Sequence, residues 1–309
     1  LKKFSPALLV ALDCGIGNFK EVKLAKKLKL EVIIIDHHEI LDKIPAASIV
    51  VDPKQEGDKY PFKGLAAVGL AFKLAELLLG KKMTDTLKKN FLELVALATL
   101  ADMMPKEDEN IIFIAKGLNS LENSWRPGLQ VILSHDYFKE YLSLEQKISK
   151  FISILNVRDV KDRFPATFRL LAAPSREEAD LIMEELIKKN EFRRERIEVI
   201  LAEAESRLSA KIAERIIFEG KEDWDYILIS IVASILSQKY KKPTFIYKKM
   251  EKESLGTVRV PRGVNSVALM KKCKKLLITY GGHPQASGFR LKNGNLEEFK
   301  KCLIKNYKT

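Results

Sequence analysis

One short stretch limits the possible folds of this chain more than any other. The β-branched run Val32–Ile35 leads directly into Asp36, His37 and His38. A continuous apolar run of this length, bounded by polar residues, predicts a strand that is buried on both faces. The three polar side chains would then follow the carboxyl end of a central strand, where open α/β sheets bind their ligands.

A second apolar run, Leu8–Leu12, also ends in an acid, Asp13. Residues 19–30 separate the two runs and have mostly helical apolar spacing. A strand, a helix and a strand in this order form a right-handed βαβ unit with parallel strands. We therefore expect Asp13 and His37 side by side at one edge of the sheet, as the start of a metal site. A lone Asp is more often a turn residue or a cap, but two of the chain's four His lie here as well, which favours a function.

Three further segments of the N-terminal half have clear patterns. A third strand is expected at Ala47–Val51 and a long apolar helix at about Leu65–Leu79. Another helix, near Phe91–Ala101, should be buried because it is apolar on nearly every side. It ends at Asp102, and an acid at a helix C-terminus needs a positive partner, which a metal ion would supply.

The C-terminal half begins with a helix start at Ser175, which Glu178 completes as a capping box. Neither Pro nor Gly follows up to about Ile217. We therefore expect about 40 residues of helix, broken at most once near Asn190, as a spacer between two domains. Beyond it the pattern indicates one helix, Val232–Tyr240, and three strands: Tyr226–Ile229, Thr244–Tyr247 and Leu255–Val260.

A glycine pair near the end of the chain precedes the last histidine. Gly281 and Gly282 permit backbone conformations and close approaches that side chains would forbid. The loop that follows, with His283, could hold a phosphate through its amides and imidazole. An ordinary Gly-Gly turn is the alternative interpretation.

Composition and charge restrict the class of protein. A chain of 309 residues with no apolar stretch near the roughly 20 residues of a membrane span is expected to form two domains and no membrane anchor. Cys14, Cys273 and Cys302 form no disulfide framework or metal spacing, which favours the reducing cytoplasm. A first residue of Leu rather than Met suggests that an upstream part is missing.

The positive charge is concentrated in the last third of the sequence. From residue 216 onward there are 19 Lys and Arg against 8 Asp and Glu, whereas the first 215 residues have 35 against 33. A basic segment of this kind indicates a polyanionic partner. Solubility, or the Lys- and Glu-rich composition of thermophiles, is the alternative explanation.

Taken together, these residues resemble the DHH phosphoesterase superfamily and, within it, the RecJ-type single-strand-specific exonucleases. Asp13-Cys-Gly resembles the second motif of the superfamily, Asp36-His-His the motif that names it, and Ala101-Asp-Met-Met-Pro the fourth motif in its RecJ form. The long helix resembles the RecJ connector. Gly281-Gly-His, with Ala286-Ser-Gly, resembles the signature of the associated DHHA1 domain. Arg259 matches the Arg of the Gly-Ser-x-Arg-Ser element of that domain.

The resemblance implies an α/β fold in which a long helix joins a parallel-sheet DHH domain to a smaller α/β DHHA1 domain. The expected ranges are 1–135 for the DHH domain, 136–217 for a mixed region and the connector helix, and 218–309 for the DHHA1 domain. Two family elements inside the chain are altered: only Asn156 remains of an Asn-x-Ala-Gly-Arg element, and Trp224-Asp-Tyr-Ile lacks the His and Gly of a Trp-His-x-Gly element. The Asp-x-Asp of the first motif would precede residue 1.

The resemblance also implies roles for particular residues. Asp13 would bridge two Mn²⁺ or Mg²⁺ ions, and His37 and Asp102 would complete the ligands of one of them, a donor set that suits these ions. His38 would contact the scissile phosphate, with Asp36 as the second expected catalytic residue. The expected substrate-binding residues are Arg259, Gly281, Gly282 and His283.

The function that follows is a metal-dependent 5′→3′ exonuclease acting on single-stranded DNA in repair and recombination. Single-strand-binding and replication proteins are further candidate partners. Without the first motif, the chain as given is expected to be impaired as a nuclease. The alternatives are a phosphodiesterase for short oligonucleotides or cyclic dinucleotides, and an inactive homologue that only binds DNA.

Overall fold

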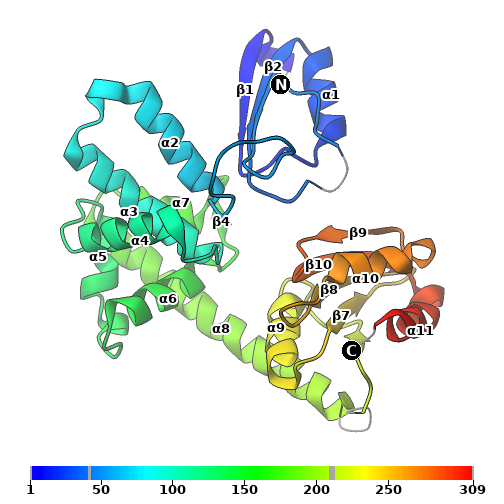
Figure 1. Cartoon of the computed structure of the whole chain (residues 1–309). Coiled ribbons are helices and arrows are strands. Elements are labelled where there is room, and N and C mark those ends of the chain that lie inside the picture. The colour runs from blue at the N-terminus through cyan, green and yellow to red at the C-terminus, as the bar shows by residue number, and fades with distance from the viewer. Residues whose placement is uncertain (1, 41–42, 209–212, 308–309) are drawn as a thin grey trace. The chain divides into compact units, whose positions relative to one another are not determined.

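The computed structural model describes residues 2–40, 43–208 and 213–307, which form two compact units, residues 1–188 and 189–309. The first unit contains a parallel sheet and a group of helices, and the second contains a five-stranded mixed sheet with helices on both faces (Figure 1). A 33-residue helix, α8, begins in the first unit and ends in the second. The expected α/β class with a long connecting helix is thus confirmed.

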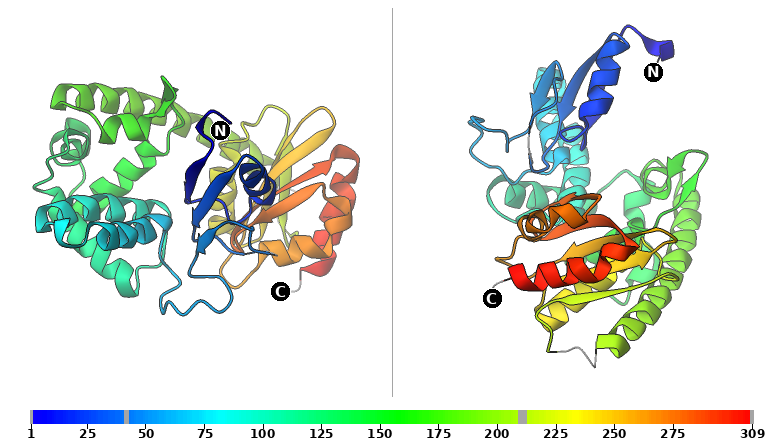
Figure 2. Two further views of the ribbon diagram at one scale, coloured as in Figure 1. Left: turned by 90° about the horizontal axis from the view of Figure 1, so that it is seen from above. Right: turned by 90° about the vertical axis from the view of Figure 1, so that its right-hand side faces the viewer.

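The N-terminal sheet has the predicted βαβ unit. Strands β1 (Ala7–Leu12) and β2 (Leu30–Ile35) are parallel neighbours, and β3 (Ile49–Val51) pairs with β2 in the same direction. Helix α1 (Phe19–Lys27) covers one face of the sheet (Figure 2), where its Val22 and Ala25 pack on apolar side chains of β2. The apolar run of β2, Val32–Ile35, is buried as expected except for the half-buried Ile33, and Glu31 before it is exposed.

The other face of this sheet is only partly covered. In β1, burial alternates along the strand, and Leu8, Val10 and Leu12 are exposed while the residues between them face α1. Near the carboxyl end of β2, Ile35 packs against Leu65 and side chains of the helices that follow. The sheet is therefore best covered at the edge where its strands end.

Seven helices follow within residues 67–208, and two short strands interrupt them. The helices are α2 (Ala67–Leu79), α3 (Asp85–Ala101), α4 (Asp108–Leu121), α5 (Pro127–Ser134), α6 (Leu144–Leu155), α7 (Ala166–Leu171) and α8 (Arg176–Leu208). The short strands β4 (Val160–Lys161) and β5 (Phe164–Pro165) pair as a hairpin.

Helix α3 begins earlier than the apolar pattern predicted. Its first residue is Asp85, because Thr84 caps it by accepting a hydrogen bond from the Leu87 amide at 3.2 Å. The segment expected from Phe91 is the part whose apolar side chains are buried. Helix α3 therefore ends, as predicted, next to Asp102, which is its C-terminal cap.

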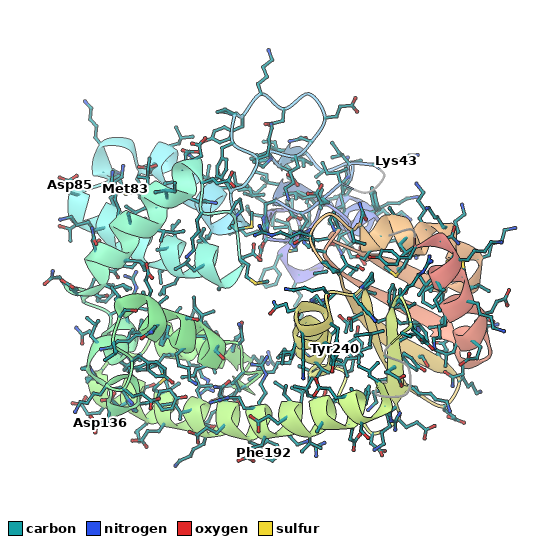
Figure 3. All side chains as sticks on the ribbon, turned by 60° about the horizontal axis from the view of Figure 1, so that its bottom comes forward. Lys43, Met83, Asp85, Asp136, Phe192 and Tyr240 are labelled. Carbon is teal, nitrogen blue, oxygen red and sulfur yellow. A yellow bond between two sulfur atoms is a disulfide. The ribbon has the colours of Figure 1, made fainter. Side chains whose placement is uncertain are left out.

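Helix α8 is unbroken but shorter than predicted. Ser175 accepts a hydrogen bond from the Glu178 amide at 3.2 Å, as expected of its N-cap. The described helix is continuous through Asn190, so the single break that the pattern allowed there does not occur, and Phe192, labelled in Figure 3, lies within it. Its described part extends to Leu208, residues 213–216 are not helical and Ile217 begins strand β6, so the prediction that the helix reaches Ile217 is wrong. No proline or glycine separates α8 from β6, so the sequence pattern predicted one continuous helix.

The sheet of the second unit has the order β6-β7-β8-β10-β9. Its strands are β6 (Ile217–Lys221), β7 (Thr244–Lys249), β8 (Glu253–Arg259), β9 (Thr279–Gly282) and β10 (Ala286–Lys292), and its helices are α9 (Ile229–Tyr240), α10 (Ser266–Lys272) and α11 (Leu296–Asn306). Phe218 and Phe245 pack against α10 and α11, which cover one face (Figure 2). Ile217 and Ile246 pack against α8 and α9 on the other.

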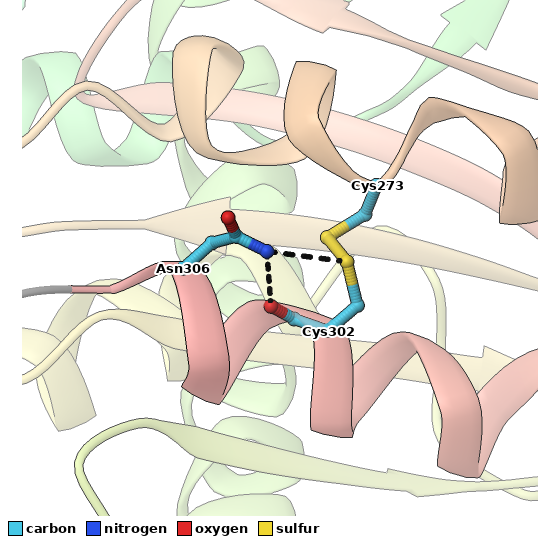
Figure 4. The surroundings of a disulfide bond; sticks show 3 residues. All are labelled: Cys273, Cys302 and Asn306. Carbon is cyan, nitrogen blue, oxygen red and sulfur yellow. Dashed lines mark hydrogen bonds between the residues drawn. A yellow bond between two sulfur atoms is a disulfide. The ribbon is translucent and has the colours of Figure 1, made fainter.

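One predicted strand and one conclusion about cysteines are wrong. Residues 226–228 form a turn and Ile229 is the first residue of α9, because Asp225 accepts a hydrogen bond from the Ile227 amide at 2.8 Å and closes that turn. Cys273 and Cys302 form a disulfide between the end of α10 and the middle of α11 (Figure 4). Their separation of 29 residues gave no sign of this pairing, which depends on how the two helices pack. None of the helices in the described residues is both long enough and apolar enough to cross a membrane.

Candidate metal centre

Two polar segments meet where β1 and β2 end. Leu12 is paired with Ile35, so Asp13 and Asp36 both leave the sheet at its carboxyl edge. The Asp13 amide donates a hydrogen bond to the carbonyl oxygen of Ile35 at 3.0 Å, which ties the end of one strand to the other. Asp13 itself has a left-handed φ of 63°, a conformation that is uncommon for a residue with a side chain. Such backbone is found most often where a side chain must be aimed.

The structure brings Asp13, His37 and Asp102 together, and we call these three residues the metal cluster. His37 Nε2 lies 3.2 Å from Asp13 Oδ1 and 3.3 Å from Asp102 Oδ2. The imidazole is almost fully buried, with 5% of its side chain exposed, whereas the two carboxylates are 67% and 49% exposed. The cluster therefore has a rigid buried donor and two carboxylates that are open to solvent.

The donor set fits a small divalent cation. Ligands about 2.1 Å from an ion at right angles to one another lie about 3 Å apart, which is close to the two separations at His37. One nitrogen and two carboxylate oxygens suit Mn²⁺ and Mg²⁺. His38 also offers a ring nitrogen here, because ligand atoms of Asp13, His37 and His38 all lie within 4.8 Å of one another.

The carboxylate of Asp36 faces the protein and holds the surrounding loops. It is buried and accepts hydrogen bonds from the Ile16 amide at 3.0 Å and from the His37 amide at 2.8 Å. A third bond, of 2.6 Å, joins it to Nδ1 of His38. Burial alone would raise the pKa of Asp36, but the bonds from His38 and from the two amides outweigh burial and lower it below its usual value.

Sequence reasoning missed a fourth acid at the same edge, Asp52. It follows β3 as Asp13 follows β1, so the same signal was present in the sequence. Asp52 is fully buried, and its Oδ1 accepts a hydrogen bond from the Lys54 amide at 2.9 Å. Burial raises the pKa of Asp52, and the neighbouring Asp36 charge raises it further. Its Oδ2 and the Nδ1 of His37 are both buried, and neither has a hydrogen-bond partner among the described residues.

The second unit holds the remaining predicted residues at one end of its sheet. Arg259, at the end of β8, is paired across the strands with Ala286, at the start of β10. The turn between β9 and β10 is closed by hydrogen bonds in both directions between the backbones of His283 and Ala286, at 2.9 and 3.1 Å. Arg259 and the turn that contains His283 therefore lie at the same end of the sheet. Burial lowers the pKa of the Arg259 guanidinium.

Gly282 is needed in this turn, and Ser266 fixes it. Gly282 has a φ of +126°, and a β-carbon there would lie 2.7 Å from the carbonyl oxygen of Ala286. The Ser266 hydroxyl, at the start of α10, donates to the carbonyl oxygen of Pro284 at 2.8 Å and lies 2.6 Å from the hydroxyl of Ser287. Ser266 was not predicted, since nothing in the sequence connects it with a loop 17 residues away.

Comparison with known proteins agrees with this architecture. Residues 2–99 match the DHH family N-terminal domain, and residues 208–309 match the DHHA1 domain. The single-stranded-DNA-specific exonuclease RecJ of Bacillus subtilis is 32% identical over 98% of this chain and 38% of its own length. RecJ of Escherichia coli is 25% identical over 95% of the chain and 55% of its own length.

A solved structure has the same fold over nearly the whole chain. The crystal structure of RecJ in complex with Mn²⁺ from Thermus thermophilus matches with a TM-score of 0.82 and 25% identity, and covers 96% of this chain and 44% of its own. The chain belongs to the DHH/DHHA1 family and is of RecJ type. It spans between 38% and 55% of the length of the two curated relatives described above.

Proposed function

We propose that this chain forms the nuclease core of a metal-dependent exonuclease that hydrolyses single-stranded DNA from the 5′ end, in repair and recombination. The observation that carries the proposal is the position of His37 Nε2 between the carboxylates of Asp13 and Asp102, at 3.2 and 3.3 Å. The RecJ relatives, which are named as single-stranded-DNA-specific exonucleases, support the choice of substrate.

In this proposal the metal cluster holds Mn²⁺ or Mg²⁺. His37, Asp102 and Asp13 would hold one ion, and the exposed carboxylate of Asp13 would also be available to a second. Two such ions, when bound, would activate the attacking water and stabilise the leaving oxygen of the phosphodiester. His37 is the rigid member, because its ring is buried and its backbone amide is held by Asp36 at 2.8 Å.

Two acids act through the histidines in this proposal. Asp36 fixes the ring of His38 at Nδ1, so that the ring keeps one orientation against the scissile phosphate. Asp36 is therefore a positioning residue, and His38 is the catalytic one. Asp52 is the outer partner that we propose for His37, because Asp52 Oδ2 and His37 Nδ1 are both buried without a hydrogen-bond partner among the described residues and the two side chains interact electrostatically. Metal-binding histidines usually donate their second ring N–H to such an outer acceptor.

We further propose that the second unit binds the DNA backbone. Arg259, Gly281, Gly282 and His283 lie at one end of the sheet, within residues 216–309, which carry 19 Lys and Arg against 8 Asp and Glu. The proposed divisions remain a DHH domain at 1–135, a mixed region with the connector at 136–217 and a DHHA1 domain at 218–309. The proposed location is the cytoplasm, with single-strand-binding and replication proteins as partners.

The test compares Asp102→Asn with Glu107→Gln, a control in an exposed acid five residues away. Mn²⁺ affinity is measured by calorimetry, and degradation is measured on 5′-phosphorylated single strands and on duplexes. We expect Asp102→Asn to weaken Mn²⁺ binding at least about tenfold and to abolish single-strand degradation. The control should match the parent chain. Unchanged Mn²⁺ binding in Asp102→Asn would overturn the metal assignment. Intact metal and DNA binding without any cleavage, both in this chain and in a version extended by an Asp-x-Asp segment, would indicate a DNA-binding protein instead of a nuclease.

A further inference from the structure

A pocket lies between α1 and the segment that joins β2 to β3. Its volume is about 650 Å³, and it extends from α1 to residues 43–46 of the segment between β2 and β3. The apolar part of its lining consists of Phe19, Val22, Ile44 and Ala46. Phe19 and Ile44 are 43% and 41% exposed, so the pocket offers an aromatic ring and an aliphatic surface to a ligand.

Among the residues that the structure describes, lysines provide all the charge of this pocket. They are Lys23, Lys26, Lys27 and Lys43, and no acidic residue of the described chain lines it. Lys26 Nζ donates to the carbonyl oxygen of Ala46 at 3.0 Å, which holds α1 to the opposite wall. The other three lysines are exposed and make no ion pair with any residue that the structure describes. We call this site the lysine pocket. Lys43 is labelled in Figure 3.

The position of the pocket relates it to the metal cluster. Helix α1 follows β1 in a βαβ unit and therefore runs back along the sheet, with its first residue at the edge where the strands end. Phe19 is that first residue, only six positions after Asp13. The lysine pocket thus begins near the edge that carries the metal cluster and continues along α1, away from it. Both sites lie within the first unit.

The chemistry of the lining selects a ligand that is both anionic and flat. Lys23 and Lys27 are one helical turn apart, about 6 Å along the axis, so they present a row of positive charge instead of a single point. The lysine ammonium is a compact point charge with three donors, which suits contacts to backbone phosphates. A groove of positive charge beside an exposed aromatic ring is the usual composition of a site for single-stranded nucleic acid.

We propose that the lysine pocket is a second binding site for single-stranded DNA, in which backbone phosphates contact Lys23, Lys27 and Lys43 and one base lies against Phe19. This proposal rests on the proposed function and extends it: a strand whose scissile phosphate is at the metal cluster continues into the lysine pocket. A short oligonucleotide reaches only one of the two sites. A long one occupies both, and its affinity depends on the lysines.

The experiment uses the full 309-residue chain and measures binding, not cleavage. The triple variant Lys23→Glu, Lys27→Glu, Lys43→Glu is compared with the control Lys81→Glu, Lys82→Glu, Lys89→Glu, which makes the same change in net charge at exposed lysines of another surface. Fluorescence anisotropy with Ca²⁺ follows oligothymidylates of about 6 and about 30 nucleotides across a range of salt concentrations. Circular dichroism checks that each variant is folded.

We expect the triple variant to bind the long strand at least about tenfold more weakly than the control does, and to lower the slope of log affinity against log salt by about 2. Affinity for the short strand should differ little between the two variants. Phe19→Ala should weaken long-strand binding about fivefold or more without changing the salt slope, because it removes a base contact and no charge.

Equal effects of the triple variant and the control on the long strand would overturn the proposal. Binding of an acidic, phenylalanine-containing peptide that is lost in the triple variant, with DNA affinity unchanged, would overturn it in favour of a protein partner. The assay measures DNA binding and does not require cleavage, so its result does not depend on whether the chain is an active nuclease. A chain without nuclease activity can still show the length dependence, and an active nuclease can lack it.

Discussion

Asp36 Oδ1 lies 2.6 Å from Nδ1 of His38, and the two side chains differ sharply in exposure: 1% for the acid and 41% for the imidazole. A carboxylate can only accept, so Nδ1 must carry the proton in this hydrogen bond. The acid is therefore fixed inside the protein and determines the tautomer of a ring at the surface. This relationship explains why the Asp must directly precede the two His: its carboxylate binds both of their backbone amides as well, at 2.8 and 3.3 Å.

The tautomer of His38 is a direct prediction. In nitrogen-15 NMR spectra of the metal-free protein at about pH 8, the neutral His38 ring should carry its proton on Nδ1, as the bond to Asp36 requires. His135 provides an internal control, because its Nδ1 accepts a hydrogen bond from the Tyr137 amide at 3.2 Å and its proton must therefore be on Nε2. Asp36→Asn should change the His38 signal, leave His135 unchanged and lower nuclease activity about 10- to 100-fold.

An Nε2-protonated His38 in the parent protein would contradict this geometry. Loss of activity in Asp36→Asn with no change in the His38 signal would mean that Asp36 acts by stabilising the loop at Ile16 and not through the histidine.

The role of Asp52 leads to a second prediction. Asp52→Asn removes the charge of a buried acid and replaces one of its two acceptor oxygens by an amide donor. We expect Mn²⁺ affinity to fall about 10- to 100-fold, the usual effect of changing an outer partner of a metal-binding histidine. Asp58→Asn is the control, since Asp58 is in the same loop and pairs with Lys63 instead. Equal Mn²⁺ affinities in the two variants would show that Asp52 does not contribute to metal binding.

The sequence was sufficient to place the residues that follow the parallel strands. A βαβ unit has a fixed handedness, so the carboxyl ends of β1 and β2 had to share one edge, and Asp13 and His37 with them. Asp102 could be added because an acid at the end of a buried apolar helix needs a positive partner. Asp52 follows the same rule as Asp13, and could have been recognised as a strand-end acid before the fold was known.

The features that the sequence did not predict depend on contacts between distant segments. Strand β6 has no breaker before it and continued the helical pattern of α8, so the strand was placed instead at Tyr226–Ile229. The disulfide depends on the packing of α10 on α11. Charge was counted over the first 215 residues together, and that total did not reveal the group of lysines on α1. In the structure Lys23, Lys26 and Lys27 line one pocket.

The pH dependence of stability supplies a third prediction, at Glu109. This half-buried acid in α4 accepts hydrogen bonds from Lys73 of α2 and from Tyr60. Burial would raise the pKa of Glu109, but these two bonds outweigh it and lower the pKa below its ordinary value of 4.5. An acid whose pKa is lowered by folding stabilises the protein above its unfolded pKa and loses this contribution as the pH falls through the folded pKa.

Glu109→Gln should therefore lower the free energy of unfolding by about 1 kcal/mol at pH 7, a value that allows for partial exposure. The difference from the parent should become smaller as the pH falls below 4.5. Urea unfolding between about pH 7 and pH 3 measures it, with Glu107→Gln as the exposed control. A difference that stays constant over this range would show that the side chain acts by packing and not by charge.

The last prediction separates stability from DNA binding in the second unit, with two buried serines on the same scaffold. Ser266 holds the turn that contains His283, through the carbonyl oxygen of Pro284 at 2.8 Å and the hydroxyl of Ser287 at 2.6 Å. Ser254, equally buried, donates to Asn293 Oδ1 at 2.8 Å near the opposite end of β8. Replacing either by Ala removes one buried hydroxyl and its hydrogen bonds, which costs about 1 kcal/mol in each case. Chemical unfolding should therefore give similar losses of stability for Ser266→Ala and Ser254→Ala.

Affinity for single-stranded DNA should fall severalfold only in Ser266→Ala, because only that change loosens the turn proposed to bind phosphate. If both variants bind DNA like the parent while both lose stability, the turn at His283 is a structural hairpin and contributes nothing to substrate binding.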